Sequence, residues 1–398
     1  MHALQLLHKQ LQKSCSVIHQ KRLDTLLLGV TTATQGHALS IASLGRGIDN
    51  HVATKHNIKR MDRLVGNSKL NQEREQIYAY LVKQCVGNKN RPIIIIDWSV
   101  LSACGAYHFL RASIALEGRA LTLYEECHPE KYLYNSKCEK LFLHTLQTLL
   151  PDGCRPIILT DAGFRNPWFK SITDLGWDYI GRVRGLTLLK LEHETQWQHC
   201  KTSYVHASIT PHYLGCGELA KASPIIGHFY LVKQEKKRRV KRNLRGKKVK
   251  CSMSLKHAKR ENEPWLLITS LQPKHDSANK IIKTYKLRMQ IEESFRDTKS
   301  AYFGIGLSVS RTHDQSRYNI LLLIASLALF LLWIIGYCTK AQGLHFQYQA
   351  NSIKHRNMLS IIFIGLEVIK RKVYSLSSRQ LMDAFLYLTT FERNNYDY

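Results

Sequence analysis

Acidic residues are scarce in this chain of 398 residues, which has 30 Asp and Glu against 58 Lys and Arg. The formal net charge is therefore +28 at pH 7. This excess is larger than solubility requires, and it predicts strong, salt-sensitive attraction to a polyanion. Nucleic acid is the expected polyanion, and an anionic membrane surface is the alternative.

Cysteine motifs are missing as well. The ten cysteines are scattered, none forms C-x-x-C, and none has the spacing to histidine that a zinc site needs. This pattern indicates reduced, mostly buried thiols in a cytoplasmic protein. The opening residues MHALQLLHKQLQKSC are too polar for a signal peptide and are predicted to form an amphipathic helix.

Long apolar runs are absent except for one, ILLLIASLALFLLWII at residues 320–335. Its length allows a short membrane span. A central helix in a large α/β core is also apolar on all sides. Because the run is single and closely follows a polar helix, we expect a core helix and no membrane contact.

The N-terminal region is predicted to be helical, in blocks at 3–19, 21–34, 38–46, 54–65 and 70–85. One of these blocks combines an apolar stripe with exposed positive charge from Lys55, Lys59, Arg60 and Arg63. Such a helix suits contact with a DNA major groove or with phosphates. The alternative is a solvated basic face without a ligand. Residues 1–88 are accordingly predicted to form a helical DNA-binding domain.

From residue 89 the pattern is α/β. The predicted strands are 93–97, 109–116, 119–128, 156–160 and 177–183, and the predicted helices are 136–150 and 166–176. Residues 184–272 alternate short β-like pieces with polar turns. They include a basic segment, 233–250, that is either a solvated loop or a hairpin lying along DNA.

The stretch TYKLRMQIEESFRDTK at 284–299 is predicted to be one continuous helix, because it contains no proline or glycine. At 100° per residue, Tyr285, Arg288, Glu292 and Lys299 share an arc with apolar residues, which should be the buried face. Ser294 and Asp297 fall on the other side. A carboxylate at Glu292 then needs either an ion pair with Arg288 or a role in an active site.

Two further carboxylates favour the active site. Asp97 and Asp161 each end a predicted buried strand, and side chains there project into the crevice at the carboxyl edge of a sheet. Three carboxylates in one site repel one another unless cations are bound. Hard oxygen ligands suit Mg²⁺ or Mn²⁺, and two such ions support in-line phosphoryl transfer.

These residues carry a family resemblance. Tyr285, Arg288, Glu292 and Lys299 match the spacing Y-x2-R-x3-E-x6-K, the YREK signature, and DWS at 97–99 and TDAGF at 160–164 resemble the two aspartate blocks. Over nearly its full length the chain resembles bacterial DDE transposases of the insertion-sequence-four family. The resemblance implies an RNase H-like core with a mostly β insertion, flanked by helical N-terminal and C-terminal regions. It places the core at 89–300 and the C-terminal region at 301–398.

The resemblance also implies a mechanism. Asp97, Asp161 and Glu292 would bind two Mg²⁺ ions, with Mn²⁺ as a substitute, while Tyr285, Arg288 and Lys299 would contact phosphate. Trp265 either stacks on a flipped base or is a core residue. The implied reaction is cut-and-paste transposition by nicking, hairpin formation and opening, and strand transfer. The implied partners are terminal inverted repeats, target DNA and a second protomer in a synaptic homodimer. A nuclease without strand transfer and an inactive DNA-binding regulator are the alternatives.

Overall fold

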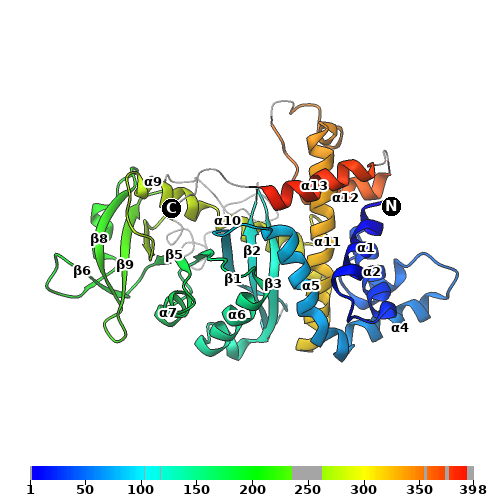
Figure 1. Cartoon of the computed structure of the whole chain (residues 1–398), viewed down its shortest axis with the longest axis horizontal. Helices are drawn as coiled ribbons and strands as arrows, with labels where there is room; N and C mark the ends of the chain where they lie inside the picture. Colours follow the sequence, from blue (N-terminus) through cyan, green and yellow to red (C-terminus); the bar gives the residue numbers. More distant parts are fainter. Residues whose placement is uncertain are drawn as a thin grey trace, which may run out of the picture. The chain divides into compact units, whose positions relative to one another are not determined.

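A computed structural model describes residues 2–102, 104–116, 118–234, 262–353, 356–372 and 376–391 of the chain. Contacts divide it into two compact units. The first unit is built from two separate stretches, Met1–Pro156 and Met289–Arg393. The second unit is formed by the stretch between them, Ile157–Arg288. Figure 1 shows the described helices and strands and labels many of them.

The first unit begins with the helices that the sequence predicts. They are α1 (His2–Ser14), α2 (Gln20–Thr34), α3 (Ile41–Arg46), α4 (Thr54–Val65) and α5 (Ser68–Val86). The stripe on α4 is buried at Met61, Leu64 and Val65. The side chain of Asn67 accepts a hydrogen bond from the Leu70 amide and so caps the N-terminus of α5.

The first unit also contains three antiparallel strands in the order β3-β2-β1. These strands are β1 (Ile93–Val100), β2 (Tyr107–Ala115) and β3 (Ala120–Pro129), and β3 is followed by helix α6 (Ser136–Leu149). Alternate residues point to opposite faces of a sheet. In the register, Asp97 lies opposite Arg111, and Arg111 lies opposite Glu125. These three charged residues therefore form a row across one face.

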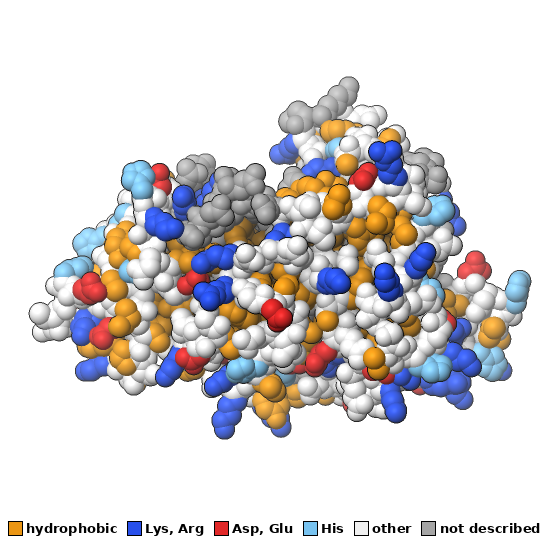
Figure 2. Space-filling view, viewed as in Figure 1, with side chains coloured by type: hydrophobic (Ala, Val, Ile, Leu, Met, Phe, Trp, Pro, Cys, Tyr) orange, Lys and Arg blue, Asp and Glu red, His pale blue; other side chains and the backbone are white. Residues whose placement is uncertain are grey.

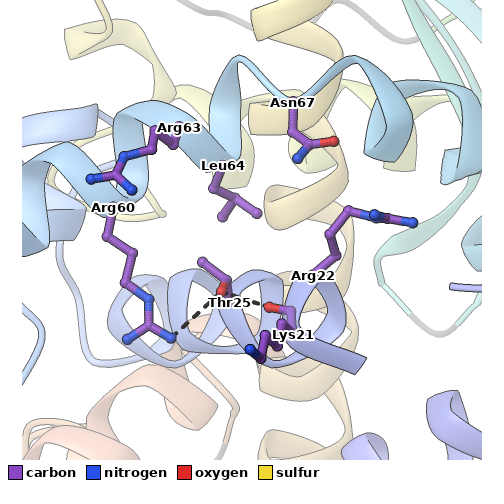
Figure 3. A pocket seen from close by; sticks show the side chains of 7 residues that line it. All are labelled: Lys21, Arg22, Thr25, Arg60, Arg63, Leu64 and Asn67. Atoms are coloured by element: carbon purple, nitrogen blue, oxygen red, sulfur yellow. Dashed lines mark hydrogen bonds between the residues drawn. The ribbon is translucent and has the colours of Figure 1, made fainter. Parts of the chain in front are cut away.

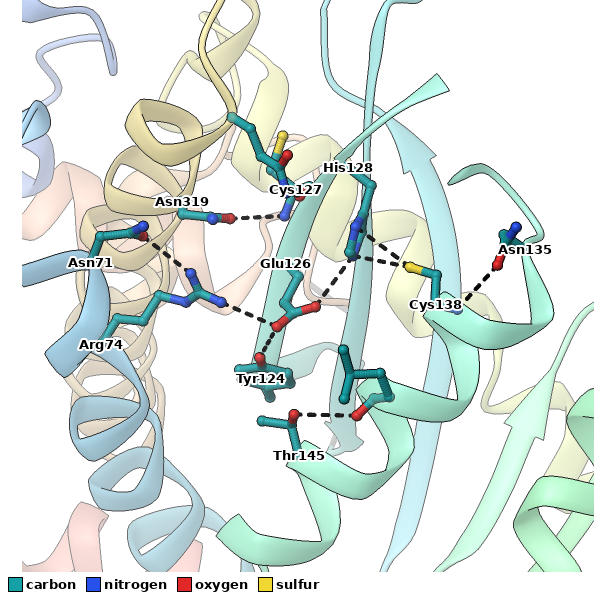
Figure 4. A network of polar contacts seen from close by, with 12 residues as sticks. Asn71, Arg74, Tyr124, Glu126, Cys127, His128, Asn135, Cys138, Thr145 and Asn319 are labelled. Carbon is teal, nitrogen blue, oxygen red and sulfur yellow. Dashed lines mark hydrogen bonds and ion pairs between the residues drawn. The ribbon is translucent and has the colours of Figure 1, made fainter. Parts of the chain in front are cut away.

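The opposite face of β3 carries a different polar network (Figure 4). Glu126 lies at its centre and pairs with Arg74 of α5 at 3.1 Å and with His128 at 3.3 Å. The Tyr124 hydroxyl also donates to Glu126. The Cys138 thiol of α6 lies 3.5 Å from the His128 ring. The network therefore ties α5 and α6 to this face of the strand.

Replacing Glu126 with glutamine is expected to lower the free energy of unfolding by about 2 kcal/mol at pH 7, because charge-assisted contacts are lost. Burial opposes ionisation of Glu126, but hydrogen bonds from His128 and Tyr124 and the charge of Arg74 outweigh it and lower its pKa. Such a carboxyl stabilises the protein above its unfolded pKa, about 4.3, and the contribution is lost as pH falls through the folded value. The free energies of unfolding of the two proteins, measured with urea, should therefore converge as the pH is lowered from 7 to 3. A difference that does not change with pH contradicts this assignment.

The core of the first unit is built around α11 (Gln315–Ala341). This helix is long and apolar enough to cross a membrane, but 94% of its most apolar window is buried within the structure. That burial is what the sequence predicts for a core helix. The side chains of Asn319 and Gln315 also bond the Cys127 amide and carbonyl, at 2.8 and 2.7 Å. They thereby cover the outer edge of β3, which would otherwise be open to pairing.

Two further helices, α12 (Ile361–Arg371) and α13 (Ser378–Thr390), pack on α11. A Cβ added at Gly336 of α11 would lie 2.0 Å from the Ile361 carbonyl oxygen, and one at Gly365 would lie 2.1 Å from that of Leu332. Only glycine allows the two helix backbones to approach this closely.

The second unit contains strands in the order β4-β5-β10-β9-β8-β6-β7. Their bounds are β4 (Ile157–Thr160), β5 (Asp178–Val183), β6 (Leu188–Leu191), β7 (Gln198–His199), β8 (His212–Leu219), β9 (Ile225–Val232) and β10 (Trp265–Thr269). β4 and β5 are parallel, with α7 (Asn166–Asp174) between them in the chain. The predicted β-like pieces after residue 184 are confirmed as strands. Most of the predicted basic hairpin, at 235–250, lies outside the described residues.

Candidate active site

The segment that carries the YREK residues is two helices, so the prediction of one continuous helix is wrong. α9 (Ser277–Lys286) and α10 (Met289–Lys299) are separated at Leu287 and Arg288. The amides of these two residues bond the carbonyls three residues earlier, at 3.0 Å each. Such bonds tighten the last turn and end the helix. The break coincides with the boundary between the two compact units.

The predicted buried face holds for α9, where Tyr285 is buried, but it is wrong for Glu292 of α10. Glu292 is exposed, and the Met289 side chain is 45% exposed, whereas Ser294 and Asp297 are buried. The buried polar residues also have partners, because Arg119 donates to Asp297 at 2.7 Å. Glu292 therefore occupies an accessible position, as a ligand-binding carboxylate requires.

The buried Ser294 accepts a hydrogen bond from Arg111 of β2. This guanidinium is fully buried and donates to the hydroxyls of Ser294 and Thr298, at 3.3 and 3.0 Å. It also forms an ion pair with Glu125 at 2.7 Å, and Ser326 of α11 donates to the same carboxylate. One buried cation thus attaches α10 to β2, while Glu125 attaches β3 to α11.

Asp97 lies on the same face of the sheet as Arg111. The sequence predicts that Asp97 ends its strand, but β1 continues to Val100, so this expectation is wrong. Pairing with β2 extends the strand through Trp98, Ser99 and Val100, beyond the apolar run that suggested its end. Asp97 is only 5% exposed, and its Oδ1 accepts a hydrogen bond from the Trp98 amide at 2.8 Å.

Lys299 joins Asp97 and Glu292 in the first unit. Its ammonium donates to the Ser99 hydroxyl at 2.7 Å and to the Val100 carbonyl at 3.2 Å. Burial and the charge of Arg111 lower the pKa of Lys299, while the nearby carboxylates of Glu292 and Asp97 act in the opposite direction. The structure therefore brings together three of the residues that the sequence singles out. An ammonium has three donors, so one is left for a further acceptor.

The remaining core residues belong to the second unit. Asp161 directly follows β4, as predicted, and its Oδ1 accepts a hydrogen bond from the Gly163 amide at 2.8 Å. Tyr285 is buried, and its ring makes an edge contact with the half-buried Trp265, with centroids 5.2 Å apart. Arg288 is half-buried at the end of α9. Trp265 and Tyr285 are therefore neighbours.

The donor chemistry fits a hard divalent cation. Asp97 and Glu292 offer only carboxylate oxygens, the ligands that Mg²⁺ and Mn²⁺ prefer. Among the described ranges, no group of three or more His, Cys, Asp and Glu side chains is arranged to hold a metal. The first unit thus supplies two carboxylates and an ammonium at one place, and Asp161 is a carboxylate of the second unit.

The basic helix α4 lies in the first unit. Lys55, Lys59, Arg60 and Arg63 are all exposed, as expected. Lys and Arg side chains gather around this helix in Figure 2. Their positions agree with either reading of the sequence, a nucleic-acid surface or a solvated face. Arg60 and Arg63 also line a cavity.

The α/β core and its acidic residues agree with an enzyme of the DDE transposase class, and the family match shows that class. The chain belongs to the family described as transposase DDE domain, which residues 88–329, more than half of the chain, match. No curated protein matches it. A similar solved structure is that of the piggyBac transposase synaptic complex with hairpin DNA. The identity is 11% and the TM-score 0.42, over 94% of this chain and 77% of that one.

Sequence reasoning missed Arg111 and Ser99. Arg111 interrupts an otherwise apolar strand, FLRASIAL, and a charge in such a strand is a usable signal, because buried charge requires partners. Ser99 lies in the DWS block, but the block does not indicate a partner for it. Its contact with Lys299 depends on the place where α10 crosses β1, which a single sequence does not show.

Proposed function

We propose that the chain catalyses cut-and-paste transposition of an insertion sequence, as a member of the insertion-sequence-four group with the YREK signature and an RNase H-like core. The observation that supports this most directly is the grouping of Asp97, Glu292 and Lys299 in a chain of the transposase DDE domain family. The net charge of +28 supports DNA as the partner.

Asp97, Asp161 and Glu292 are the proposed ligands of two Mg²⁺ ions, which Mn²⁺ can replace. When bound, such ions activate the attacking water or hydroxyl and stabilise the leaving oxygen. Lys299 is held at the end of β1 by Ser99 and Val100. Its free donor would bind a phosphate oxygen of the scissile strand.

The second unit would position DNA. Arg288 would neutralise phosphate, and Tyr285 would contribute a hydrogen bond beside Trp265. Trp265 would stack on an unpaired base, a contact worth roughly 1–3 kcal/mol. The edge contact from Tyr285 would then fix the plane of the Trp265 ring.

The proposed sequence of steps is nicking at the transposon end, attack of the freed 3′-hydroxyl on the opposite strand, opening of the resulting hairpin, and joining to target DNA. Two protomers would hold two terminal inverted repeats, so the active complex would be a homodimer. The proposed compartment is the cytoplasm.

Strand cleavage is expected to depend on divalent metal. The full chain is mixed with labelled DNA carrying the ends that flank its gene, in Mg²⁺, in Mn²⁺ and in EDTA, and the products are resolved on denaturing gels. Nicks and hairpins at those ends in either metal, and their loss in EDTA, are the expected result. A randomly permuted end sequence is the control. Cleavage of both DNAs alike would indicate a general nuclease, and binding without cleavage would indicate a regulator.

A further inference from the structure

A cavity of about 450 Å³ opens between α2 and the junction of α4 with α5. Its lining consists of Lys21, Arg22, Thr25, Arg60, Arg63, Leu64 and Asn67. Figure 3 shows the α2 side chains on one side and Arg60, reaching down from α4, on the other. Four of the seven lining residues are cations, and none is an acid. The cavity is therefore built for a negatively charged group.

The charges of this cavity are not neutralised equally. Arg22 donates to Glu73 at 2.9 Å, so its charge is already paired. The nearby acids Asp24 and Asp62 are paired with His8 and Arg317. Within the described part of the chain, no ion pair involves Lys21, Arg60 or Arg63. Three cations of the cavity are thus available to bind an anion.

Asn67 adds neutral donors at the same place. Its side-chain oxygen is used to cap α5, because it accepts from the Leu70 amide at 2.8 Å. The side-chain NH₂ group is therefore left to donate. α5 is 19 residues long, and the positive end of its dipole lies at this cap. Thr25 cannot offer its proton, since its hydroxyl donates to the Lys21 carbonyl at 2.7 Å and also lies 3.5 Å from Arg60 as an acceptor. Every polar group that is still available is a donor.

We infer that this cavity binds a backbone phosphate of duplex DNA through Lys21, Arg60, Arg63 and the Asn67 amide. The inference rests on the proposed DNA function and assigns a second role to α4. Arg60 and Arg63 would bind this phosphate, whereas Lys55 and Lys59 lie outside the cavity lining. A phosphate contact positions a protein on DNA without reading its sequence.

The test measures DNA affinity against salt concentration in EDTA, where cleavage does not interfere. The probe is a fluorescent 30-base-pair duplex of arbitrary sequence, followed by fluorescence anisotropy. Lys21→Ala and Arg63→Ala are each expected to weaken binding several-fold and to lower the slope of log K against log salt by about 1. Lys83→Ala is the matched control, because Lys83 is an exposed lysine in the last turn of α5, the helix that Asn67 caps, and lies outside the cavity lining. It should leave the slope within error of wild type.

Asn67 offers a sharper comparison, because serine and aspartate both preserve the helix cap. Asn67→Ser removes the donor without adding charge, whereas Asn67→Asp places a carboxylate in the cavity. Asn67→Asp is expected to weaken DNA binding at least about tenfold, because like charges then meet. Asn67→Ser should have a smaller effect. Thermal unfolding of both variants close to that of wild type shows that the cap and the fold are retained.

Three results would overturn the inference. The first is a slope for Lys21→Ala and Arg63→Ala equal to that for Lys83→Ala. The second is equal binding by Asn67→Asp and Asn67→Ser. The third combines two observations: inorganic phosphate at constant ionic strength stabilises wild type but not Asn67→Asp, and DNA affinity is unchanged in all variants. This result would make the cavity a site for free anions. If the protein does not cleave DNA in Mg²⁺ but the salt slopes are as expected, the proposed function is overturned and the phosphate-binding cavity is retained.

Discussion

Replacing Glu292 with glutamine is expected to reduce metal-dependent strand cleavage by about 10³-fold or more, with little change in stability. Glu292 is exposed, so its side chain contributes little to packing. The amide removes a negatively charged ligand, and metal ions contribute several kcal/mol of transition-state stabilisation. Each 1.36 kcal/mol corresponds to a factor of ten in rate. The rate of first-strand nicking in single-turnover gels measures the effect.

The neighbouring residue provides the control. Glu293 is on the same helix and its side chain is 40% exposed, but it pairs with Arg296 and Arg119. Glu293→Gln should therefore cleave within a few-fold of wild type. DNA affinity should not fall in Glu292→Gln, since the variant carries one negative charge fewer. A nicking rate for Glu292→Gln within tenfold of wild type would remove Glu292 from the catalytic site.

Replacing Glu125 with glutamine is expected to destabilise the first unit by about 3–5 kcal/mol, because it leaves a buried charge without its partner. Arg111 and Glu125 both have side chains with 0% exposure and lie 2.7 Å apart. The glutamine keeps the size and polarity of the side chain, so the loss reports the missing charge. Urea unfolding followed by circular dichroism at pH 7 measures the change.

The double variant Arg111→Met with Glu125→Leu separates charge from packing. Replacing a whole buried pair with apolar residues is often neutral or stabilising, so this protein should regain most of the stability lost in Glu125→Gln. Its α10 helix loses the anchor that Arg111 supplies to Ser294 and Thr298, however. We therefore expect a folded protein with impaired cleavage. A double variant less stable than Glu125→Gln contradicts this account.

Local sequence pattern was enough for most of the secondary structure. The five N-terminal helices, the strand before Asp161 and the core helix α11 were all predicted, because each has a clear apolar period or a continuous apolar run. The same pattern placed Asp161 correctly at a strand end. It was less reliable for Asp97, where pairing with β2 carries the strand three residues further.

For the candidate site, the sequence proposed residues but gave the wrong geometry for one of them. The signature spacing identified Glu292 and Lys299, yet helical periodicity assigned Glu292 to the buried face. Periodicity cannot show that the helix breaks at Leu287, since no proline or glycine marks the break. It also treats Ser294 as solvent-facing, because its partner Arg111 lies more than 180 positions earlier in the chain. Long-range polar contacts decided the orientation of α10.

The division of the first unit into two distant stretches has a consequence for synthesis of the chain. Asp97 and Glu292 are 292 − 97 = 195 positions apart, which takes roughly 10–40 s at ribosomal rates of about 5–20 residues per second. After β3 is completed at Pro129, α11, which packs on β3, has still not been made. Nascent chains therefore carry an uncovered apolar surface, and products that end before Gln315 lack the helix needed to complete the core.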